Sequence, residues 1–386
     1  MEDILSGLNE KQVEAVTAPD GPLLVLAGAG SGKTKTLTHR VAYLIKERGL
    51  EPGSILTVTF TNKAAEEMKG RIRALLGERI DPPLMGTFHS VCANFLRRDI
   101  DRLGWERNFS IIDAADQLSL IKSLMKELSF DPKQISPRAV IAGISRAKNS
   151  LVSPAVAAER ADSHFEEIVA KIFAAYEARL RQIGALDFDD LLVMTVRLWQ
   201  ENEDVLHRYR ERFSHILVDE YQDTNHIQYR LINLLAGERK NIFVIGDDYQ
   251  SIYSFRAADI GNILNFRRDY PHSRVITLER NYRSSGNILA AASEVISRNR
   301  SQHHKKLRTD REAGEKITVC AAASEKDEAA FVAEEIDALR ESGRSWGEIT
   351  ILYRANSQSR NLEEAFIRAG VPYRIVGGLK FYDRKE

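Results

Sequence analysis

The feature that most constrains this chain is the run from Ala27 to Thr34, which reads AGAGSGKT. An apolar run, residues 23–26, precedes it, and residues 37–45 follow it with apolar side chains at helical spacing. A glycine-rich turn between strand and helix lets backbone N–H groups surround phosphate oxygens at the positive end of the helix dipole. Lys33 can neutralise phosphates there, and the Thr34 hydroxyl can ligate Mg²⁺. The run therefore predicts a nucleotide-binding loop formed by Ala27, Gly28, Ala29, Gly30, Ser31, Gly32, Lys33 and Thr34, although Ala27 stands where the usual pattern begins with Gly.

Length and charge limit the class of protein. The 386 residues allow two or three domains, and the hydrophobic fraction of 43% suits a globular chain. Basic and acidic residues both number 55, so any nucleic-acid site must be a local patch. Cys92 and Cys320 fit no metal spacing, and we expect two free thiols in a reducing, cytoplasmic setting. Neither a signal peptide nor an apolar run of about 20 residues is visible, so we expect no membrane association.

Two acids follow a second apolar strand. Residues 215–218 form an apolar strand pattern that ends in Asp219 and Glu220. Asp219 can hold Mg²⁺, and Glu220 can orient and deprotonate an attacking water. A further strand, residues 241–245, leads to Gln250, which we expect near a γ-phosphate. Together with the phosphate loop, these residues predict ATP hydrolysis at the ends of strands in one sheet.

Aromatic residues also follow strand patterns. Phe60 and His89 would lie just past two strand ends, where ligands bind in an open α/β sheet. Each could equally be a core aromatic or a helix cap. Tyr253 and Phe255 are two positions apart, so in an extended loop they would share a face. They could stack on unpaired bases or simply anchor the loop.

The middle of the chain changes character. From residue 113 to about 184, apolar side chains recur at helical spacing, in one stripe from Leu118 to Leu128 and another from Phe165 to Leu180. This pattern predicts a helical subdomain inserted into an α/β domain. Residues 187–190 contain three aspartates, which could suggest metal, but Asp also favours a helix N-terminus. We favour a helix start and a domain hinge there.

Basic residues dominate the later part. Arg283 is a candidate arginine finger for the charge that develops during phosphoryl transfer. Residues 298–311 form a basic stretch that is either a surface loop with phosphate affinity or a solvated loop. Residues 317–320 and 349–353 read as strands on either side of a helix from about residue 326 to 339. They predict a second α/β unit.

These motifs, in this order, resemble the UvrD/Rep/PcrA family of superfamily 1 DNA helicases. The resemblance covers nearly the whole chain through the stretches LNEKQVEAV, AGAGSGKT, TFTNKAAEEM, GTFHSV, ILVDEYQDTN, VIGDDYQSIYSFR, LERNYRSS and YRANSQSRNLEEAF. It implies an α/β fold with a RecA-like P-loop NTPase domain, residues 1–112 and 187–277, and a helical insertion, residues 113–186. Residues 278–386 would be the N-terminal, incomplete part of a second RecA-like domain.

The resemblance also implies roles for single residues. Gln12 would read adenine and Tyr282 would stack on it, while Lys35 and Arg71 would contact phosphate or ribose. The catalytic set would be Lys33, Asp219, Glu220, Gln250 and Arg283, acting on ATP with Mg²⁺ held by Thr34 and Asp219. The single-strand path would be lined by Phe60, Asn62, His89, Tyr253, Phe255 and Arg256.

The implied activity is ATP-driven 3′–5′ movement on single-stranded DNA and at single-strand–duplex junctions, in repair or replication restart, by a monomer that can meet repair or replication proteins. Two departures stand out: Phe255 occupies a position where many relatives have Trp, and Ala257 replaces a common Gly. The chain also stops where a second inserted subdomain would begin, so we expect weak or absent unwinding by this chain alone. The alternatives are the motor of a helicase–nuclease and a nucleotide-dependent DNA-binding module without turnover. A small P-loop kinase is more distant, because Gln250 and the acid pair argue against it.

Overall fold

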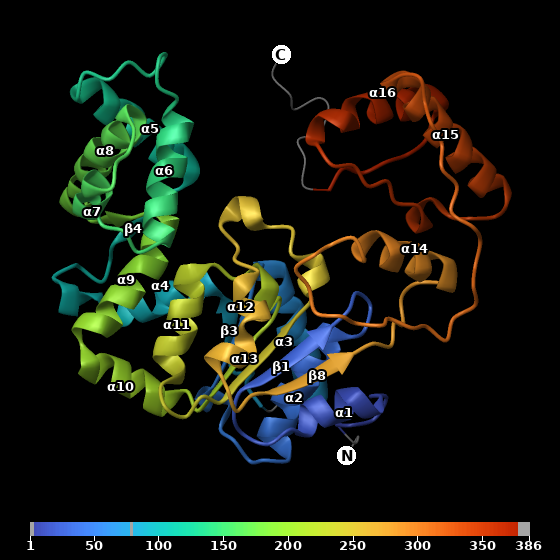
Figure 1. Ribbon diagram of the computed structural model, residues 1–386, viewed down its shortest axis with the longest axis horizontal. Helices are drawn as coiled ribbons and strands as arrows, with labels where there is room; N and C mark the ends of the chain where they lie inside the picture. Colours follow the sequence, from blue (N-terminus) through green and yellow to red (C-terminus); the bar gives the residue numbers. More distant parts are fainter. Residues whose placement is uncertain (1–3, 78–79, 377–386) are drawn as a thin grey trace. The chain divides into compact units, whose positions relative to one another are not determined.

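The computed structural model describes residues 4–77 and 80–376, which belong to two compact units, Met1–Gly314 and Glu315–Glu386. The first unit is built on a six-stranded sheet in the order β3-β2-β6-β7-β1-β8, in which every paired neighbour is parallel (Figure 1). Its strands are β1 (Leu23–Ala27), β2 (Ile55–Thr59), β3 (Leu84–Thr87), β6 (His215–Val218), β7 (Ile242–Gly246) and β8 (Arg274–Leu278). The strands expected at residues 23–26, 215–218 and 241–245 are present as β1, β6 and β7, within one residue at each end.

Helices cover both faces of the sheet, which explains why its strands are continuously apolar. In β1, Leu24 and Leu26 join one core, while Leu23, Val25 and Ala27 join the core on the opposite face. The second of these cores includes α2 (Lys33–Lys46), α3 (Asn62–Leu76) and part of α1 (Glu10–Thr17). The first includes α4 (Phe88–Asp99), α9 (Phe188–Glu201), α10 (Glu203–Arg212), α11 (His226–Ala236), α12 (Gly261–Leu264) and α13 (Phe266–Asp269). Both sides of the nucleotide-loop strand are therefore held by packing.

The helices expected between residues 113 and 184 are present as α5 (Ala114–Glu127), α6 (Pro137–Asn149), α7 (Pro154–Glu159) and α8 (His164–Gln182). Their apolar stripes form a separate core that includes Ile121, Met125, Ile172 and Phe173. At the base of the insertion, the two-residue strands β4 (Ser110–Ile111) and β5 (Ala185–Leu186) pair in parallel. The chain therefore leaves and re-enters the sheet domain at one place.

Asp187 is the N-cap of α9, where its carboxylate accepts a hydrogen bond from the Asp190 N–H at 2.8 Å. The favoured interpretation of this stretch as a helix start is confirmed. Lys148 of α6 inserts its fully buried ammonium between the two carboxylates, 2.8 Å from Asp187 and 2.6 Å from Asp190. Tyr176 of α8 donates a further hydrogen bond to Asp187 at 3.0 Å. The insertion is thus fastened to α9 by a buried ionic cluster.

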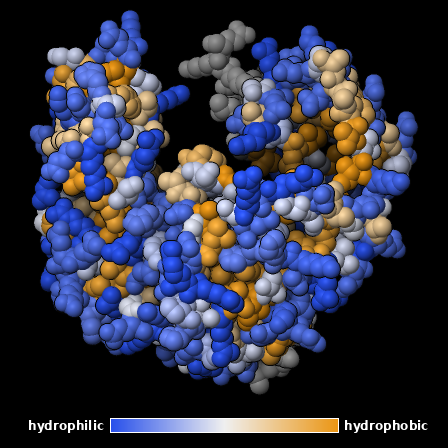
Figure 2. Space-filling model, in the orientation of Figure 1, coloured by the Kyte–Doolittle hydropathy of each residue, from blue (hydrophilic) through white to orange (hydrophobic). Residues whose placement is uncertain are grey.

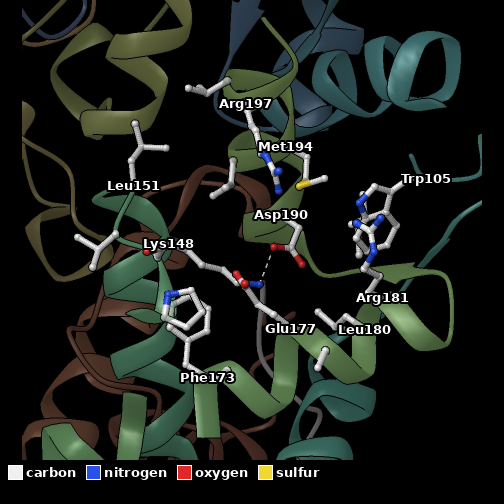
Figure 3. A pocket seen from close by; sticks show the side chains of 18 of the residues that line it. Trp105, Lys148, Leu151, Phe173, Glu177, Leu180, Arg181, Asp190, Met194 and Arg197 are labelled. Atoms are coloured by element: carbon white, nitrogen blue, oxygen red, sulfur yellow. Dashed lines mark ion pairs between the residues drawn. The ribbon is translucent and has the colours of Figure 1, made fainter. Parts of the chain in front are cut away.

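A cavity of about 580 Å³ borders this cluster. Figure 3 shows Glu177 and Arg181 of α8 facing Met194 and Arg197 of α9 across it, with the Lys148–Asp190 ion pair inside. The joint between the insertion and the sheet domain is therefore incompletely packed around its charged centre.

Beyond β8, the first unit continues through α14 (Gly286–Ile296). The second unit contains α15 (Glu325–Glu341) and α16 (Ser359–Ala369), whose core includes Ala333, Ile336 and Phe366. The strands expected at residues 317–320 and 349–353 are wrong: neither segment is a strand in the described structure. Apolar alternation gives a strand only where a neighbouring strand takes the backbone hydrogen bonds. No described segment does so here.

Across residues 4–77 and 80–376, no helix is both long enough and apolar enough to cross a membrane.

Candidate functional site

The nucleotide-loop candidate leaves β1 after Ala27 and enters α2 at Lys33. Gly30 and Gly32 have left-handed backbone conformations, with φ of 68° and 88°. Side-chain-bearing residues rarely adopt these angles, so glycine is needed at both turns. The loop is braced internally, because Ser31 Oγ donates a hydrogen bond to the Gly28 carbonyl at 2.6 Å. The result is the strand–turn–helix arrangement that the sequence predicted.

Lys33 brings the loop and the two later strand ends together. Its Nζ donates a hydrogen bond to Gln250 Oε1 at 3.0 Å and lies 3.5 Å from Glu220 Oε2. Glu220 follows β6 and Gln250 follows β7, and both strands end at the same edge of the sheet as β1. Glu220 itself has a φ of 48°, a left-handed conformation that costs about 1 kcal/mol or more for a residue with a side chain. The structure thus joins these three predicted catalytic residues and holds one of them under backbone strain.

Asp219 lies beside them and is 4% exposed. Burial and the nearby Glu220 carboxylate raise the pKa of Asp219 to about 7, although Lys33 opposes the shift. Its Oδ1 is buried and has no hydrogen-bond partner among the described residues. A desolvated carboxylate oxygen without a partner is costly unless a cation or donor satisfies it. Asp219 Oδ1 is therefore a hard oxygen whose interactions the described residues leave unsatisfied.

Gln222 connects the acids to the neighbouring loop, and sequence reasoning missed it. Its Nε2 donates to Glu220 Oε2 at 2.9 Å and to Asp223 Oδ2 at 3.2 Å. Its Oε1 accepts a hydrogen bond from the Asp247 N–H at 2.9 Å. The only sequence signal was its place two residues after Glu220. A buried amide of this kind fixes the orientation of the carboxylate next to it.

Arg283 reaches the nucleotide loop through its neighbour Asn281, another residue that we did not single out. Asn281 Nδ2 donates to the Ala29 carbonyl at 2.6 Å, and its Oδ1 accepts from the Arg283 N–H at 2.8 Å. A Cβ placed on Gly30 would lie 2.7 Å from the Arg283 Cβ. The backbone of Arg283 is therefore anchored against the loop, while its side chain is exposed.

The predicted adenine residues also lie close to the loop: the Tyr282 N–H donates to the Gly30 carbonyl at 2.9 Å. Gln12 is buried, and its Nε2 donates to the Ser31 carbonyl at 2.9 Å. Tyr282 OH accepts a hydrogen bond from Asn9 Nδ2 at 2.7 Å. Lys35 donates to the Gly7 carbonyl at 2.7 Å, and Arg71 pairs with Glu67 on its own helix. Gln12, Tyr282 and Lys35 thus gather at the loop, whereas the contact shown for Arg71 is local to α3.

The predicted single-strand residues meet in an aromatic group. Phe60 stacks on Tyr253 with ring centroids 6.2 Å apart, and Tyr253 lies 5.8 Å from Phe255. Phe255 belongs to the short helix η5 (Ser254–Arg256) and is 68% exposed. The segment is therefore helical rather than extended, yet the two rings still touch. Figure 2 shows hydrophobic side chains on the outer surface of the protrusion that contains η5.

A cavity of about 800 Å³ adjoins this group. It is lined by Phe60, His89 and Phe255 from the sheet domain and by Ser145 and Arg146 from α6 of the insertion. Burial lowers the pKa of His89, which favours the uncharged imidazole at neutral pH.

Asn62 is exposed at the start of α3. The Arg256 side chain lies outside the described part of the chain.

The basic stretch lies at the surface as expected for Arg300, Lys306 and Arg308, which are exposed, but Lys305 departs from both interpretations offered from the sequence. Lys305 has a side chain with no exposed surface, paired with Asp247 and Asp248. The burial of Lys305 could not be predicted from the residues around it in the sequence, because its partners Asp247 and Asp248 lie more than 50 positions away.

Comparison with known proteins gives the family. Residues 8–271 match the UvrD/REP helicase N-terminal domain, and residues 276–386 match the UvrD-like helicase C-terminal domain. The chain belongs to the UvrD/Rep helicase family. It is 50% identical over 99% of its length to a protein of Bacillus subtilis named ATP-dependent DNA helicase PcrA. Proteins of the same name from Staphylococcus epidermidis and Staphylococcus aureus are 49% identical over the whole chain. The chain spans about half the length of these relatives, 52–53%.

Proposed function

We propose that this chain is the ATP-hydrolysing motor part of a DNA helicase that moves 3′ to 5′ on single-stranded DNA. The observation that supports this most is the meeting of Lys33, Glu220 and Gln250 at one sheet edge. Family membership and the PcrA name of the relatives agree with it. The biological setting would be repair or replication restart, at single-strand–duplex junctions. Repair or replication proteins would be its partners.

The residues present fit Mg²⁺. Asp219 offers a buried, unsatisfied oxygen, and Thr34 provides a hydroxyl in the first turn of α2. Hard oxygen donors of this kind suit a magnesium ion bound together with nucleotide phosphates. When bound, the ion would neutralise charge on the phosphate oxygens during transfer. Among the described residues, no cluster of three or more His, Cys, Asp or Glu forms an all-protein metal site, which agrees with a metal held by few side chains and the substrate.

The chain's own residues would divide the chemistry. Lys33 contacts oxygens of Glu220 and Gln250. A bound γ-phosphate would compete with both for the Lys33 ammonium, because its oxygens would seek the same donor. Once Glu220 is released from Lys33, its carboxylate would accept a proton from the attacking water. The Gln222 amide would keep its hydrogen bond to Glu220 Oε2 and so hold the carboxylate in place. Arg283 would stabilise the charge that builds up on the transferred group, from a backbone that Asn281 fixes. Gln12 and Tyr282 would recognise adenine.

Coupling to DNA would pass through the loop after β7. That loop carries Gln250 at the nucleotide site and Tyr253 and Phe255 in the aromatic group. Bases stacked on these rings would restrain the loop that positions Gln250. Aromatic stacking is worth about 1–3 kcal/mol per base, enough to shift such an equilibrium by about 5–100-fold.

The test is ATP turnover by the purified chain with and without poly-dT. We expect hydrolysis that increases on adding poly-dT and little strand separation by the chain alone. Hydrolysis without any response to poly-dT would overturn the coupling. Binding of ATP and DNA without turnover would favour a nucleotide-dependent binding module. A reading frame that encodes a nuclease beyond residue 386 would identify a helicase–nuclease.

A further inference from the structure

Lys305 is a buried cation that no part of the proposed chemistry uses. Its Nζ lies 2.7 Å from Asp247 Oδ1, pairs with Asp248 as well, and sits 3.9 Å from the Tyr249 ring centroid. Its backbone N–H donates to the Tyr249 hydroxyl at 3.1 Å. These three partners immediately precede Gln250. Lys305 therefore contacts three consecutive residues of the loop that carries Gln250.

The same segment is also fixed to the strand end that carries Arg283. The Arg308 N–H donates to the Glu279 carbonyl at 2.9 Å, and the Asn281 N–H donates back to the Arg308 carbonyl at 2.7 Å. These bonds form a parallel bridge between Arg280 and Arg308. Asn281 is the residue that ties Arg283 to the nucleotide loop. Residues 305–308 thus connect the Gln250 loop to the Arg283 strand end, a connection we call the tie segment.

The tie segment also lies directly against the nucleotide loop. A Cβ placed on Gly28 would be 2.3 Å from Leu307 Cδ2. Any side chain at this position would push Leu307 away, so the glycine leaves room for the tie segment as well as for phosphate. The segment accordingly contacts all three parts of the site: the nucleotide loop, the Gln250 loop and the Arg283 strand end.

The electrostatics make Lys305 hard to replace. Burial would raise the pKa of Asp248, but hydrogen bonds from His303 and Lys305 lower it to about 2. Asp248 is therefore ionised at neutral pH beside Asp247. Two buried carboxylates next to each other need a cation, and removing one partner leaves an uncompensated charge. The ammonium is what allows the loop to fold tightly with both acids inside.

We propose that Lys305 is a positioning residue for ATP hydrolysis, holding the Gln250 loop in register with the Arg283 strand end through the tie segment. This inference rests on the proposed function. Lys305 touches no reacting atom in this assignment and acts through Asp247 and Asp248. Its loss should lower kcat while leaving ATP affinity nearly unchanged, because the Lys33 loop remains intact.

The experiment compares Lys305→Met with Lys306→Met, an exposed neighbour that serves as the matched control. The double variant Lys305→Met with Asp248→Asn removes the tie without leaving the same excess of buried negative charge. Two properties are measured on folded protein: amide hydrogen exchange of residues 247–253, and kcat and KM for ATP with saturating poly-dT. Thermal unfolding and fluorescent-nucleotide binding check that each variant is folded.

For Lys305→Met we expect at least about tenfold faster exchange in residues 247–253 and a kcat about 10–100-fold lower, with KM within about threefold. The double variant should regain stability but not kcat. Unchanged exchange would overturn the positioning role, and so would faster exchange with an unchanged kcat. Full recovery of kcat in the double variant would reduce Lys305 to a charge-balancing residue and overturn the inference too. If the unmodified chain hydrolyses no ATP, the proposed function fails, while the exchange comparison still decides whether Lys305 holds the loop.

Discussion

Lys33 and Gln250 are 217 positions apart in the sequence, yet the Lys33 ammonium donates a hydrogen bond of 3.0 Å to the Gln250 amide oxygen. The contact exists because β1 and β7 are adjacent parallel strands, so the loops after them leave the sheet side by side. Glu220 reaches the same ammonium from β6, the next strand along. Lys33, which follows β1, therefore contacts the segments that follow β6 and β7 and links the ends of three neighbouring strands.

Glu220→Gln should remove ATP turnover and leave nucleotide binding intact. The amide cannot accept the proton of the attacking water, and general-base catalysis typically contributes about 10²–10⁴-fold. We expect kcat to fall by about that factor, with the dissociation constant of a fluorescent ATP analogue within about threefold. Glu211→Gln, in an exposed ion pair with Arg239, is the matched control. Turnover retained in Glu220→Gln would remove this residue from the mechanism.

Asp219→Asn should stabilise the fold at pH 8 and lose that advantage near pH 4. The pKa of Asp219, raised to about 7, means that the folded chain holds this proton more tightly than the unfolded chain. The free energy of unfolding therefore falls as pH rises from about 4 to about 7. Asparagine avoids that loss and should add about 2–4 kcal/mol at pH 8. Urea unfolding at both pH values, without nucleotide or Mg²⁺, measures the difference. Asp204→Asn at an exposed site is the control, and an equal gain at both pH values would contradict the prediction.

Lys148→Met should weaken the joint between the helical insertion and α9. It leaves Asp187 and Asp190 buried without their cation, a change that typically costs about 3–5 kcal/mol. Lys171→Met on the exposed side of α8 should change stability by less than about 0.5 kcal/mol. Urea unfolding measures both variants. Equal stabilities would mean that water already solvates the cluster, through the cavity that adjoins it.

Ala257→Gly should stabilise the chain. Ala257 has a φ of 63°, a conformation that glycine adopts without steric cost. We expect a gain of about 0.5–1 kcal/mol in the free energy of unfolding, after allowing for the greater freedom of glycine in the unfolded chain. Ala258→Gly, at a neighbouring position that pairs with Asn225, should instead destabilise. A lower melting temperature for Ala257→Gly would show that the Ala257 methyl makes a contact worth more than the strain.

Phe255 substitutions should change affinity for single-stranded DNA in opposite directions. Phe255→Ala should weaken oligo-dT binding by about 5–100-fold, because it removes a stacking surface worth about 1–3 kcal/mol. Phe255→Trp should strengthen it by about 2–5-fold through a larger ring. Fluorescence anisotropy at fixed salt measures both. Ile252→Trp is the matched control, since Ile252 is 69% exposed on the same loop. A gain from Ile252→Trp equal to that from Phe255→Trp would point to non-specific contact.

Much of the fold was predictable because its signals are local. Apolar runs followed by glycine or acidic residues predicted β1, β6 and β7, and helical periodicity predicted the insertion. The order of motifs also pointed to Lys33, Glu220 and Gln250 as one site. The strand predictions for residues 317–320 and 349–353 were wrong. The pattern of apolar residues describes only side chains, whereas a strand also needs a neighbouring strand to pair with its backbone N–H and C=O groups.

The missed residues share a physical cause. Asn281, Gln222 and Lys305 each contact at least one residue that is distant in the sequence and that only the fold brings close: Ala29, Asp247 and the Asp247–Asp248 pair, respectively. Lys305 looks like any surface lysine until β7 brings Asp247 and Asp248 beside it. For Arg71, the sequence resemblance implied a contact with phosphate or ribose. The ion pair that the structure shows for Arg71 is instead with Glu67, one turn away on the same helix.

The strand order also sets a schedule for synthesis. β2 can pair with β3 as soon as residue 87 has emerged, but β1 has no strand partner until β7 and β8, at residues 242–246 and 274–278, have been made. At a translation rate of about 5–20 residues per second, β1 remains without a strand partner for roughly 10–40 s after it has been synthesised. A nascent chain cut anywhere before residue 242 therefore exposes an unpaired, aggregation-prone β1, and chaperone dependence should end only after β8 is complete.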